Sequence, residues 1–213
     1  MEAYKDLSRS IAGHTAIITG AASGMGRATA HLFAQQGASV AVTDLDQAKC
    51  DAVAAEIAEA DYAGQALPLA LDVTDLTAIG SVIAQTAEAF GGLDIVVNNA
   101  GFARHAMIED EHYPEVWGAS LDAMLTAHQR IIRAAMPHLK KSAHPRIVNI
   151  ASTEGLGATP GNSPYVAAKH GVIGLTRGMA VDLGRDGITC NCVCPGPIRT
   201  GITDAIPEEH KTI

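Results

Sequence analysis

Short apolar runs alternate with helical segments along nearly the whole chain, and this alternation constrains the fold more than any other feature. Six runs read as strands, at residues 14–19, 38–43, 64–70, 94–97, 146–150 and 188–193. Between them, helices are predicted at residues 27–36, 47–59, 76–90, 115–141 and 163–183, the fourth bent or ended near Pro137. Such alternation predicts a parallel sheet with helices on both faces. The predicted class is therefore α/β, a doubly wound parallel sheet, with residues 1–213 forming a single domain.

Composition excludes several classes of protein. The chain is 47 % hydrophobic and 18 % charged, with a net charge of −8 and no basic cluster, so we expect no nucleic-acid partner. No apolar run approaches the roughly 20 residues that a membrane span needs. The first ten residues are polar and of mixed charge, unlike a signal peptide, so we expect a cytoplasmic protein.

Three of the four cysteines, Cys190, Cys192 and Cys194, alternate along one apolar segment, which places them on the same face of a strand. A zinc site would need a fourth ligand and turn-like spacing. We therefore expect buried free thiols rather than a disulfide, and no metal site.

A glycine-rich loop joins the first strand to the first helix. Gly20 permits a sharp turn, Gly24 would let the backbone approach a pyrophosphate, and Gly26 would let the helix pack close to the sheet. The helix N-terminus would offer amides and a positive dipole to phosphates. A plain strand–helix turn is the alternative, but this context favours a dinucleotide site.

Asp44 ends the second strand, about 20 residues beyond the glycines, where an acid can bind both hydroxyls of the adenosine ribose. It would also repel a 2′-phosphate, and neither Ser23 nor Leu45 offers a cation to bind one. Asp44 could instead be only a turn residue, while Asp46 competes for the N-cap of the next helix. We favour the ribose interpretation, and hence NAD over NADP.

The carboxyl ends of the other strands carry further polar or rigid positions, at residues 72, 98–101, 152 and 195–200. Ligands bind outside these ends in open α/β sheets. The two asparagines, Asn98 and Asn99, can tie their strand end to its neighbours through both amide groups.

Ser152, Tyr165 and Lys169 form a candidate catalytic group. Ser163 is a good N-cap for a helix with Pro164 at its first position, and Tyr165 and Lys169 are four apart on one face. A nearby cation stabilises a phenolate and lowers its pKa, while Ser152 could hold a substrate oxygen against the phenol. The alternative is a surface tyrosine over an extended lysine side chain.

Taken together, these motifs resemble the short-chain dehydrogenase/reductase family over nearly the whole chain. The resemblance implies a Rossmann-like fold and hydride transfer between NAD(P) and a secondary alcohol or ketone, with 3-oxoacyl and other hydrophobic substrates among the candidates. It gives Tyr165 the acid/base role, lets Ser152 orient the substrate oxygen, and makes Lys169 bind the nicotinamide ribose. The expected cofactor-binding positions are Gly20, Ser23, Gly24, Met25, Gly26, Asp44, Leu45, Asp72, Val73, Asn99, Ala100, Gly101, Tyr165, Lys169, Pro195, Gly196, Ile198 and Thr200.

Two departures from the family pattern stand out. Met124 occupies the position of an asparagine that anchors a water leading to the lysine, which favours an alternative function as a catalytically weak NAD-binding sensor or partner protein. The chain also stops at Ile213, so the substrate lid and last strand of the family are expected to be missing.

The family resemblance further implies a homodimer or homotetramer. Small residues at 167, 171, 174 and 178 form a stripe along the helix that carries Tyr165. The stripe would let a second subunit approach closely, although it could instead serve packing within one subunit.

Overall fold

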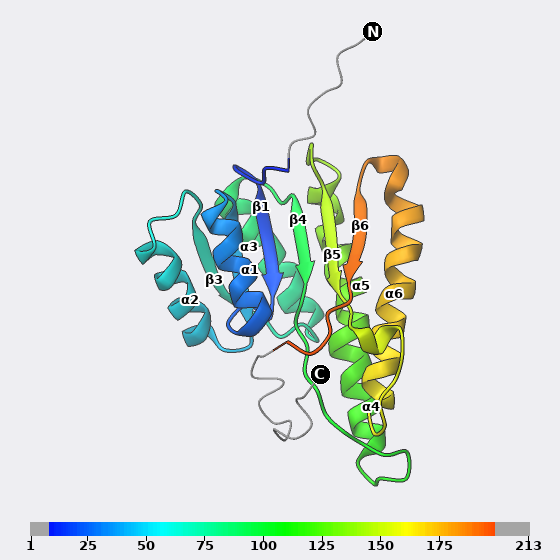
Figure 1. Ribbon diagram of the computed structural model, residues 1–213. Helices are drawn as coiled ribbons and strands as arrows, with labels where there is room; N and C mark the ends of the chain where they lie inside the picture. The colour runs from blue at the N-terminus through cyan, green and yellow to red at the C-terminus, as the bar shows by residue number, and fades with distance from the viewer. Residues whose placement is uncertain (1–8, 199–213) are drawn as a thin grey trace.

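The computed structural model describes residues 9–198 and contains a six-stranded parallel sheet (Figure 1). The strand order is β3-β2-β1-β4-β5-β6. The strands are β1 (Thr15–Thr19), β2 (Ser39–Asp44), β3 (Ala66–Ala70), β4 (Ile95–Asn98), β5 (Arg146–Ile150) and β6 (Thr189–Val193). The helices are α1 (Gly24–Gln35), α2 (Gln47–Glu59), α3 (Leu76–Phe90), α4 (Tyr113–Leu121), α5 (Ala127–Leu139) and α6 (Ser163–Leu183). The predicted doubly wound α/β class is confirmed.

Two hydrophobic cores lie on opposite faces of the sheet. Ile18 and its neighbours on β2 and β4 pack against α1 and α2. Ile17, the adjacent residue, belongs to the core that packs against α3 and α5. Successive side chains on a strand point to opposite faces, so the fully buried β1 presents apolar side chains to both cores at its central positions, Ala16, Ile17 and Ile18.

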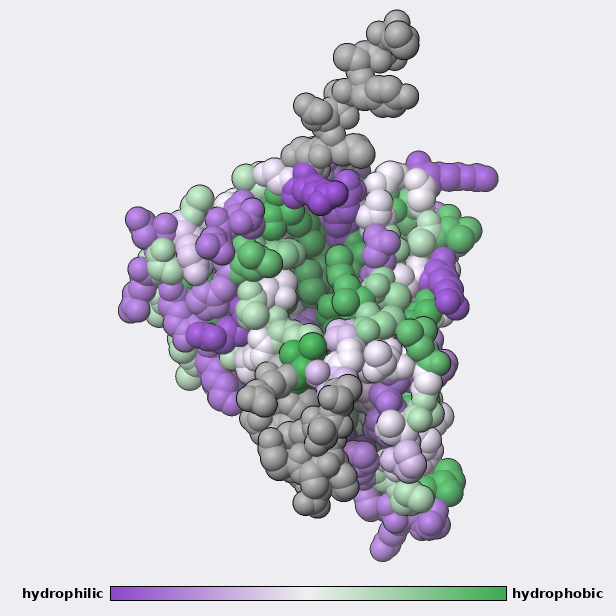
Figure 2. Space-filling model, viewed as in Figure 1, coloured by the Kyte–Doolittle hydropathy of each residue, from purple (hydrophilic) through white to green (hydrophobic). Residues whose placement is uncertain are grey.

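Helices do not cover the whole sheet within residues 9–198. On the α1/α2 face, β5 and β6 lie uncovered in Figure 1, and Val193 is 50 % exposed. Figure 2 shows apolar residues on this face between the α1–α2 side and α6.

The strand order reverses between β1 and β4. β1 pairs with β2 on one side and with β4 on the other, so the connections from their carboxyl ends diverge to opposite faces and leave a crevice. As expected, Asn98 and Asn99 tie the carboxyl end of β4 to the neighbouring strands. The Asn99 side chain donates to the Thr19 carbonyl at 2.8 Å, and Asn98 donates to Asn149 Oδ1 at 2.8 Å.

The long helix predicted over residues 115–141 ends near Pro137 as expected, because α5 ends at Leu139. It also has an interruption that was not predicted, η1, a π-helical turn over Asp122–Thr126, where the Ala127 amide bonds to the Asp122 carbonyl. Pro137 lies inside α5, which ends two residues later. Its missing amide therefore disturbs only the final turn, whereas the π-turn divides the helix.

Two smaller predictions need correction. Ser163 is the first residue of α6 rather than its N-cap, and its hydroxyl lies 2.9 Å from the Tyr113 hydroxyl. The cysteines are free thiols as expected, but only Cys190 of the alternating three is buried, while Cys192 and Cys194 are half-buried. They lie at the carboxyl end of an edge strand, where covering is incomplete.

The described residues contain no helix that is both long enough and apolar enough to span a membrane. They also contain no group of three or more His, Cys, Asp or Glu side chains arranged to hold a metal.

Candidate functional site

The loop between β1 and α1 has the geometry that its glycines predict. Gly20 adopts a φ of +63°, in the left-handed region that favours glycine. A Cβ atom at Gly26 would lie 2.1 Å from the Gly20 carbonyl oxygen, so only glycine lets α1 approach the strand this closely. Ser23 is the N-cap but makes no side-chain cap bond, so its hydroxyl does not satisfy the first-turn amides. These amides and the helix dipole provide an anion site.

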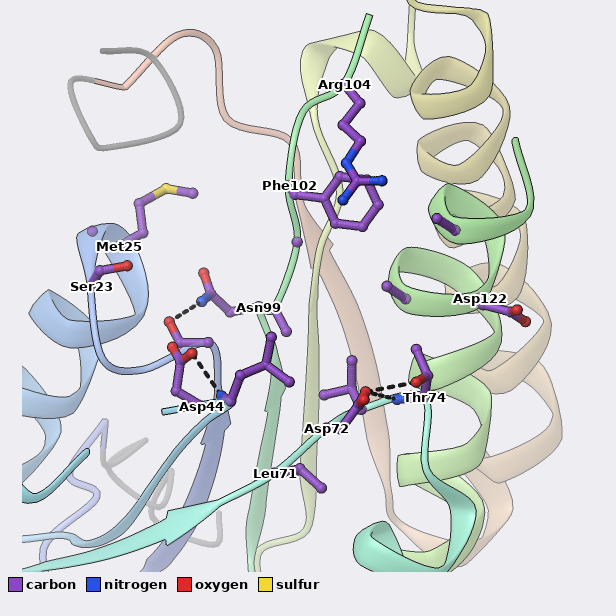
Figure 3. Close-up of a pocket in the computed structure, with 18 residues that line it drawn as sticks. Ser23, Met25, Asp44, Leu71, Asp72, Thr74, Asn99, Phe102, Arg104 and Asp122 are labelled. Carbon is purple, nitrogen blue, oxygen red and sulfur yellow. Dashed lines mark hydrogen bonds between the residues drawn. The ribbon is translucent and has the colours of Figure 1, made fainter. Parts of the chain in front are cut away.

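The loop opens onto a cleft of about 530 Å³ at the carboxyl ends of the central strands (Figure 3). Eleven of the residues predicted to bind the cofactor line this cleft: Gly20, Ser23, Gly24, Met25, Asp44, Leu45, Asp72, Val73, Asn99, Ala100 and Gly101. Gly26 is not among the lining residues, but its close approach to the Gly20 carbonyl lets α1 pack against the loop that forms the cleft wall.

The Asp44 carboxylate is fixed at the cleft wall. Its oxygens accept hydrogen bonds from the Ala22 amide at 3.1 Å and the Leu45 amide at 2.8 Å. Asp46, not Asp44, caps α2, because its side chain accepts from the amides of Ala48 and Lys49. The N-cap of α2 is therefore Asp46, and the Asp44 carboxylate lines the cleft.

A turn formed by Asp72 shapes the opposite wall. Asp72 Oδ1 accepts from the Thr74 amide at 2.8 Å and from the Thr74 hydroxyl at 2.7 Å. Thr74 lines the cleft but was not among the predicted positions. An aspartate two residues before a threonine is a recognisable turn signal, so this turn could have been predicted.

The cleft has further lining residues that the sequence did not reveal: Leu71, Phe102, Arg104, Ala119, Asp122 and Ala123. Among residues 9–198, Arg104 is the only Lys or Arg that lines the cleft. Its guanidinium lies 5.2 Å from the centre of the Phe102 ring and 3.5 Å from Glu115. In Figure 3 it lies at the end of the cleft away from Asp44. The position of Phe102 just after β4 was an available signal, whereas α4 and η1 join the cleft only through tertiary packing.

Ser152, Tyr165 and Lys169 come together beside the ends of β5 and β6. Ser152 stands at the N-cap of a 3₁₀ turn, η2 (Thr153–Gly155), where its Oγ accepts from the Glu154 amide at 3.1 Å. Lys169 is 3 % exposed and donates to the Ile150 carbonyl at 2.8 Å. Its Nζ lies 5.5 Å from the centre of the Tyr165 ring. The alternative of a surface pair is wrong, because the lysine is buried.

Burial dominates the protonation of this group. It raises the pKa of Tyr165 above its ordinary value, a hydrogen bond with Ser152 acts in the opposite direction, and the Glu154 carboxylate raises the pKa further. Burial also lowers the pKa of Lys169 to about 8, partly opposed by Cys194. In the protein by itself burial therefore raises the pKa of Tyr165, and the lowering expected from Lys169 together with the charge of the oxidised nicotinamide stays a prediction.

The segment after β6 adjoins the same place. The Ala151 amide donates to the Val193 carbonyl at 2.8 Å, and the Thr153 amide donates to the Pro195 carbonyl at 2.9 Å. Figure 1 shows this segment crossing the carboxyl ends of the strands. It carries the predicted residues Pro195, Gly196 and Ile198, while Thr200 lies outside the described residues.

Two buried residues complete the surroundings. Met124, in η1, is fully buried beside Gly101. His128, one turn later on α5, is 2 % exposed, and within residues 9–198 neither ring nitrogen has a hydrogen-bond partner. The sequence offered no signal for His128, because a histidine on a helix face can equally well be exposed.

Comparisons with known proteins agree with this arrangement. A family profile described as "short chain dehydrogenase" matches residues 14–211. The chain is 40 % identical to the (2S)-[(R)-hydroxy(phenyl)methyl]succinyl-CoA dehydrogenase subunit BbsD of Thauera aromatica, over 94 % of this chain and 79 % of that protein. It is 39 % identical to a D-beta-hydroxybutyrate dehydrogenase of Rhizobium meliloti, over 93 % and 77 % respectively.

Two further relatives extend the comparison. A 3-oxoacyl-[acyl-carrier-protein] reductase FabG of Thermotoga maritima is 37 % identical, over 93 % of this chain and 80 % of that protein. The crystal structure of a dehydrogenase/reductase from Sinorhizobium meliloti superposes with a TM-score of 0.87 at 39 % identity, covering 94 % of this chain and 78 % of that one. The chain therefore belongs to the short-chain dehydrogenase family, oxidoreductases that use a nicotinamide cofactor on alcohols and ketones.

Proposed function

We propose that this enzyme interconverts a secondary alcohol and a ketone, with Tyr165 as the acid/base and NAD as the cofactor. The observation that carries the proposal is the meeting of the Tyr165 phenol with Ser152 and the buried Lys169, beside the glycine-lined cleft. The bound nicotinamide ring supplies or accepts the hydride. The protein's own residues must then orient the substrate and move one proton.

Each of the three side chains has a separate task. Ser152 hydrogen-bonds the substrate oxygen and holds it beside the Tyr165 hydroxyl. In the oxidative direction the phenolate of Tyr165 takes the alcohol proton, and in the reductive direction the phenol returns it. Burial disfavours the phenolate, so the Lys169 ammonium and the charge of the bound oxidised cofactor must stabilise it.

The cleft fits a dinucleotide. The missing side chain at Gly26 allows a close approach of α1 to the strand, and the amides of the first turn of α1 face anionic groups. The fixed Asp44 carboxylate supports NAD, because it can accept hydrogen bonds from two ribose hydroxyls and repels a 2′-phosphate. Arg104, the one Lys or Arg that lines the cleft in the part of the chain that the structure describes, is paired with Glu115 away from Asp44.

Three relatives indicate the class of substrate. Their names specify a hydroxy(phenyl)methyl succinyl-CoA, a β-hydroxybutyrate and a 3-oxoacyl group. All three carry an oxygen function on the carbon β to a carboxyl or thioester group. A β-hydroxy or β-oxo acyl compound is therefore the first substrate class to examine.

The test is turnover of NAD with a panel of secondary alcohols, including β-hydroxy acids and their thioesters. Tyr165→Phe keeps the ring and removes the proton-carrying hydroxyl. It should reduce turnover by about 10²–10⁴-fold while cofactor binding changes little. Tyr62→Phe is the matched control, because Tyr62 packs edge-on against His31, on the α1 side of the sheet. A Tyr165→Phe enzyme that keeps most of its rate would exclude the assigned role.

A second candidate is a catalytically weak NAD-binding sensor. It is favoured by Met124, whose buried thioether cannot anchor a water as an amide can. Cofactor binding without turnover across the whole panel would support this candidate.

We further propose assembly as a homodimer or homotetramer through α6. The glycines of the predicted small-residue stripe differ in what lies beside them. A Cβ at Gly171 would lie 2.6 Å from Leu125 of the same subunit, whereas Gly174 and Gly178 face open space. Val181, on the same helix, is 80 % exposed, so this end of α6 offers a small, partly apolar surface to another subunit.

A further inference from the structure

His128 is the most unusual buried group that the proposed function leaves unexplained. Its side chain is 2 % exposed, yet neither ring nitrogen finds a hydrogen-bond partner among residues 9–198. An apolar side chain of similar size would fill the same space without the cost of removing polar atoms from water. Buried polar atoms are normally satisfied by the protein or by an ordered water, so the imidazole indicates a polar contact at this position.

The position of His128 relates it to Lys169. His128 lies in the first turn of α5, directly after η1, and Leu125 of η1 packs against Gly171, two residues beyond Lys169 on α6. The charge of Lys169 acts on the His128 ring, where it adds to burial in lowering the pKa of the imidazole to about 3. His128 is therefore a neutral imidazole within the electrostatic influence of a buried ammonium.

The layer between the sheet and these helices contains more polar groups. Asn98 donates to Asn149, and Asn149 donates to the Thr176 hydroxyl on α6 at 2.9 Å. Asn98 Oδ1 is a further buried oxygen without a partner in the described part of the chain. Asn98 and Val96 share a strand face, and Val96 packs in the same core as α5. Polar atoms thus occupy the side of the sheet that α5 and α6 cover.

We propose that His128 is a positioning residue for Lys169, whose ammonium it holds through a hydrogen bond carried by one bridging water. A neutral imidazole presents one acceptor nitrogen and one N–H. The acceptor, through the water, adds a partner to an ammonium whose one hydrogen bond among the described residues is to the Ile150 carbonyl. This contact favours the charged form of Lys169, which stabilises the Tyr165 phenolate. Met124, one turn earlier, cannot supply such a contact.

The groups around the pair are few. Among residues 9–198, Lys169 Nζ lies over the Tyr165 ring, Cys194 acts on the pKa of Lys169, and the charge of Lys169 acts on the pKa of His128. The Glu154 carboxylate acts on Tyr165. Asn98 and Asn149, on the strands, do not titrate in this range. A change in the protonation of Lys169 can therefore be followed at His128.

The first test uses the resting protein and does not depend on the proposed activity. The ring nitrogens of ¹⁵N-histidine-labelled protein are followed by NMR, with His128 assigned from the loss of its signals in His128→Gln. We expect a neutral ring at pH 5, and ring shifts that change on Lys169→Met but not on Lys140→Met. Lys140 is the matched control, because it pairs with Asp186 at the surface. A His128 ring that titrates near pH 6.5, or that does not respond to Lys169→Met, would overturn the proposal.

The second test rests on the proposed dehydrogenase activity. In the pH profile of kcat, the alkaline limb on which Lys169 loses its charge should move down by about one pH unit in His128→Phe, as expected for loss of one hydrogen bond to a charged group. His128→Gln keeps an acceptor and should restore most of the shift. Thr86→Val is the control for losing a buried polar group, because the hydrogen bond of the Thr86 hydroxyl among residues 9–198 is to Val82 within α3. An alkaline limb at the same pH in wild type and His128→Phe would mean that the His128 ring only fills space, which would overturn the proposal.

Discussion

His128 should make the fold sensitive to acid. Burial, with a smaller contribution from the charge of Lys169, lowers the pKa of its imidazole from an ordinary 6.5 to about 3. Between these two values the unfolded chain binds a proton on this ring and the folded chain does not. The free energy of unfolding therefore falls as the pH drops below 6.5, and this contribution is fully lost at about pH 3.

The magnitude follows from the size of the shift. One such group changes the free energy of unfolding by about 1.4 kcal/mol per pH unit inside this window. The loss from His128 alone is then roughly 2 kcal/mol by pH 5 and roughly 5 kcal/mol by pH 3, a large share of the 5–15 kcal/mol that is usual for a domain.

The assay is urea unfolding of wild type and His128→Phe at half-unit steps from pH 7 to pH 4.5. Subtracting the two curves removes the carboxylates that both chains share. We expect wild type to lose stability more steeply, by about 1.4 kcal/mol per unit below pH 6. His170→Gln is the control and should follow wild type, because the ring of His170 is exposed. Parallel curves for wild type and His128→Phe would refute the reasoning, whatever their offset at pH 7.

Three other predictions concern the proposed function. Asp44→Ala should narrow the ratio of kcat/KM for NAD over NADP, because the carboxylate that excludes a 2′-phosphate is lost, and a wild-type preference for NADP would contradict the assignment. Met124→Asn should raise turnover, or leave it unchanged if His128 already supplies the polar contact near Lys169; a marked loss with normal folding would count against both views. Gly178→Arg should reduce the mass measured by light scattering at micromolar concentration. The open space beside Gly178 would hold the new side chain without disturbing the subunit, and the side chain would then block the approach of a second subunit. A wild-type protein that is monomeric in this assay would contradict the proposed interface.

The parts of the fold that local chemistry determines could be predicted from the sequence. Asp75 caps α3 by accepting from the amides of Thr77 and Ala78, and Gly91 follows the helix in the left-handed conformation. Both features depend on residue type within a few positions. The glycine loop and the buried strands are of the same kind, which is why their positions were predicted within three residues.

The features that were missed depend on contacts distant in sequence. Nothing near residue 124 marks a π-turn, whereas the packing of Leu125 on Gly171 is visible only in three dimensions. The raised pKa of Tyr165 in the protein by itself could not be predicted, because the neighbouring cation is evident from the spacing, whereas the extent of burial is not. Asp122 lines the cleft only through the tertiary packing of η1, whereas Arg104 reaches it from the loop between β4 and α4.

The strand order also has a consequence for the order of folding. β1 can pair with β2 after one short crossover, but it meets β4 only after about 80 intervening residues, as the bond from Asn99 to Thr19 shows. Contacts that close such long loops carry a greater entropy cost and tend to form late. The cleft lies along this late seam, so the β1–β2–β3 half can acquire native pairing before any dinucleotide site exists. Ligand binding would then report completion of the whole sheet, and a ligand that bridges the seam would stabilise the last step of folding by mass action.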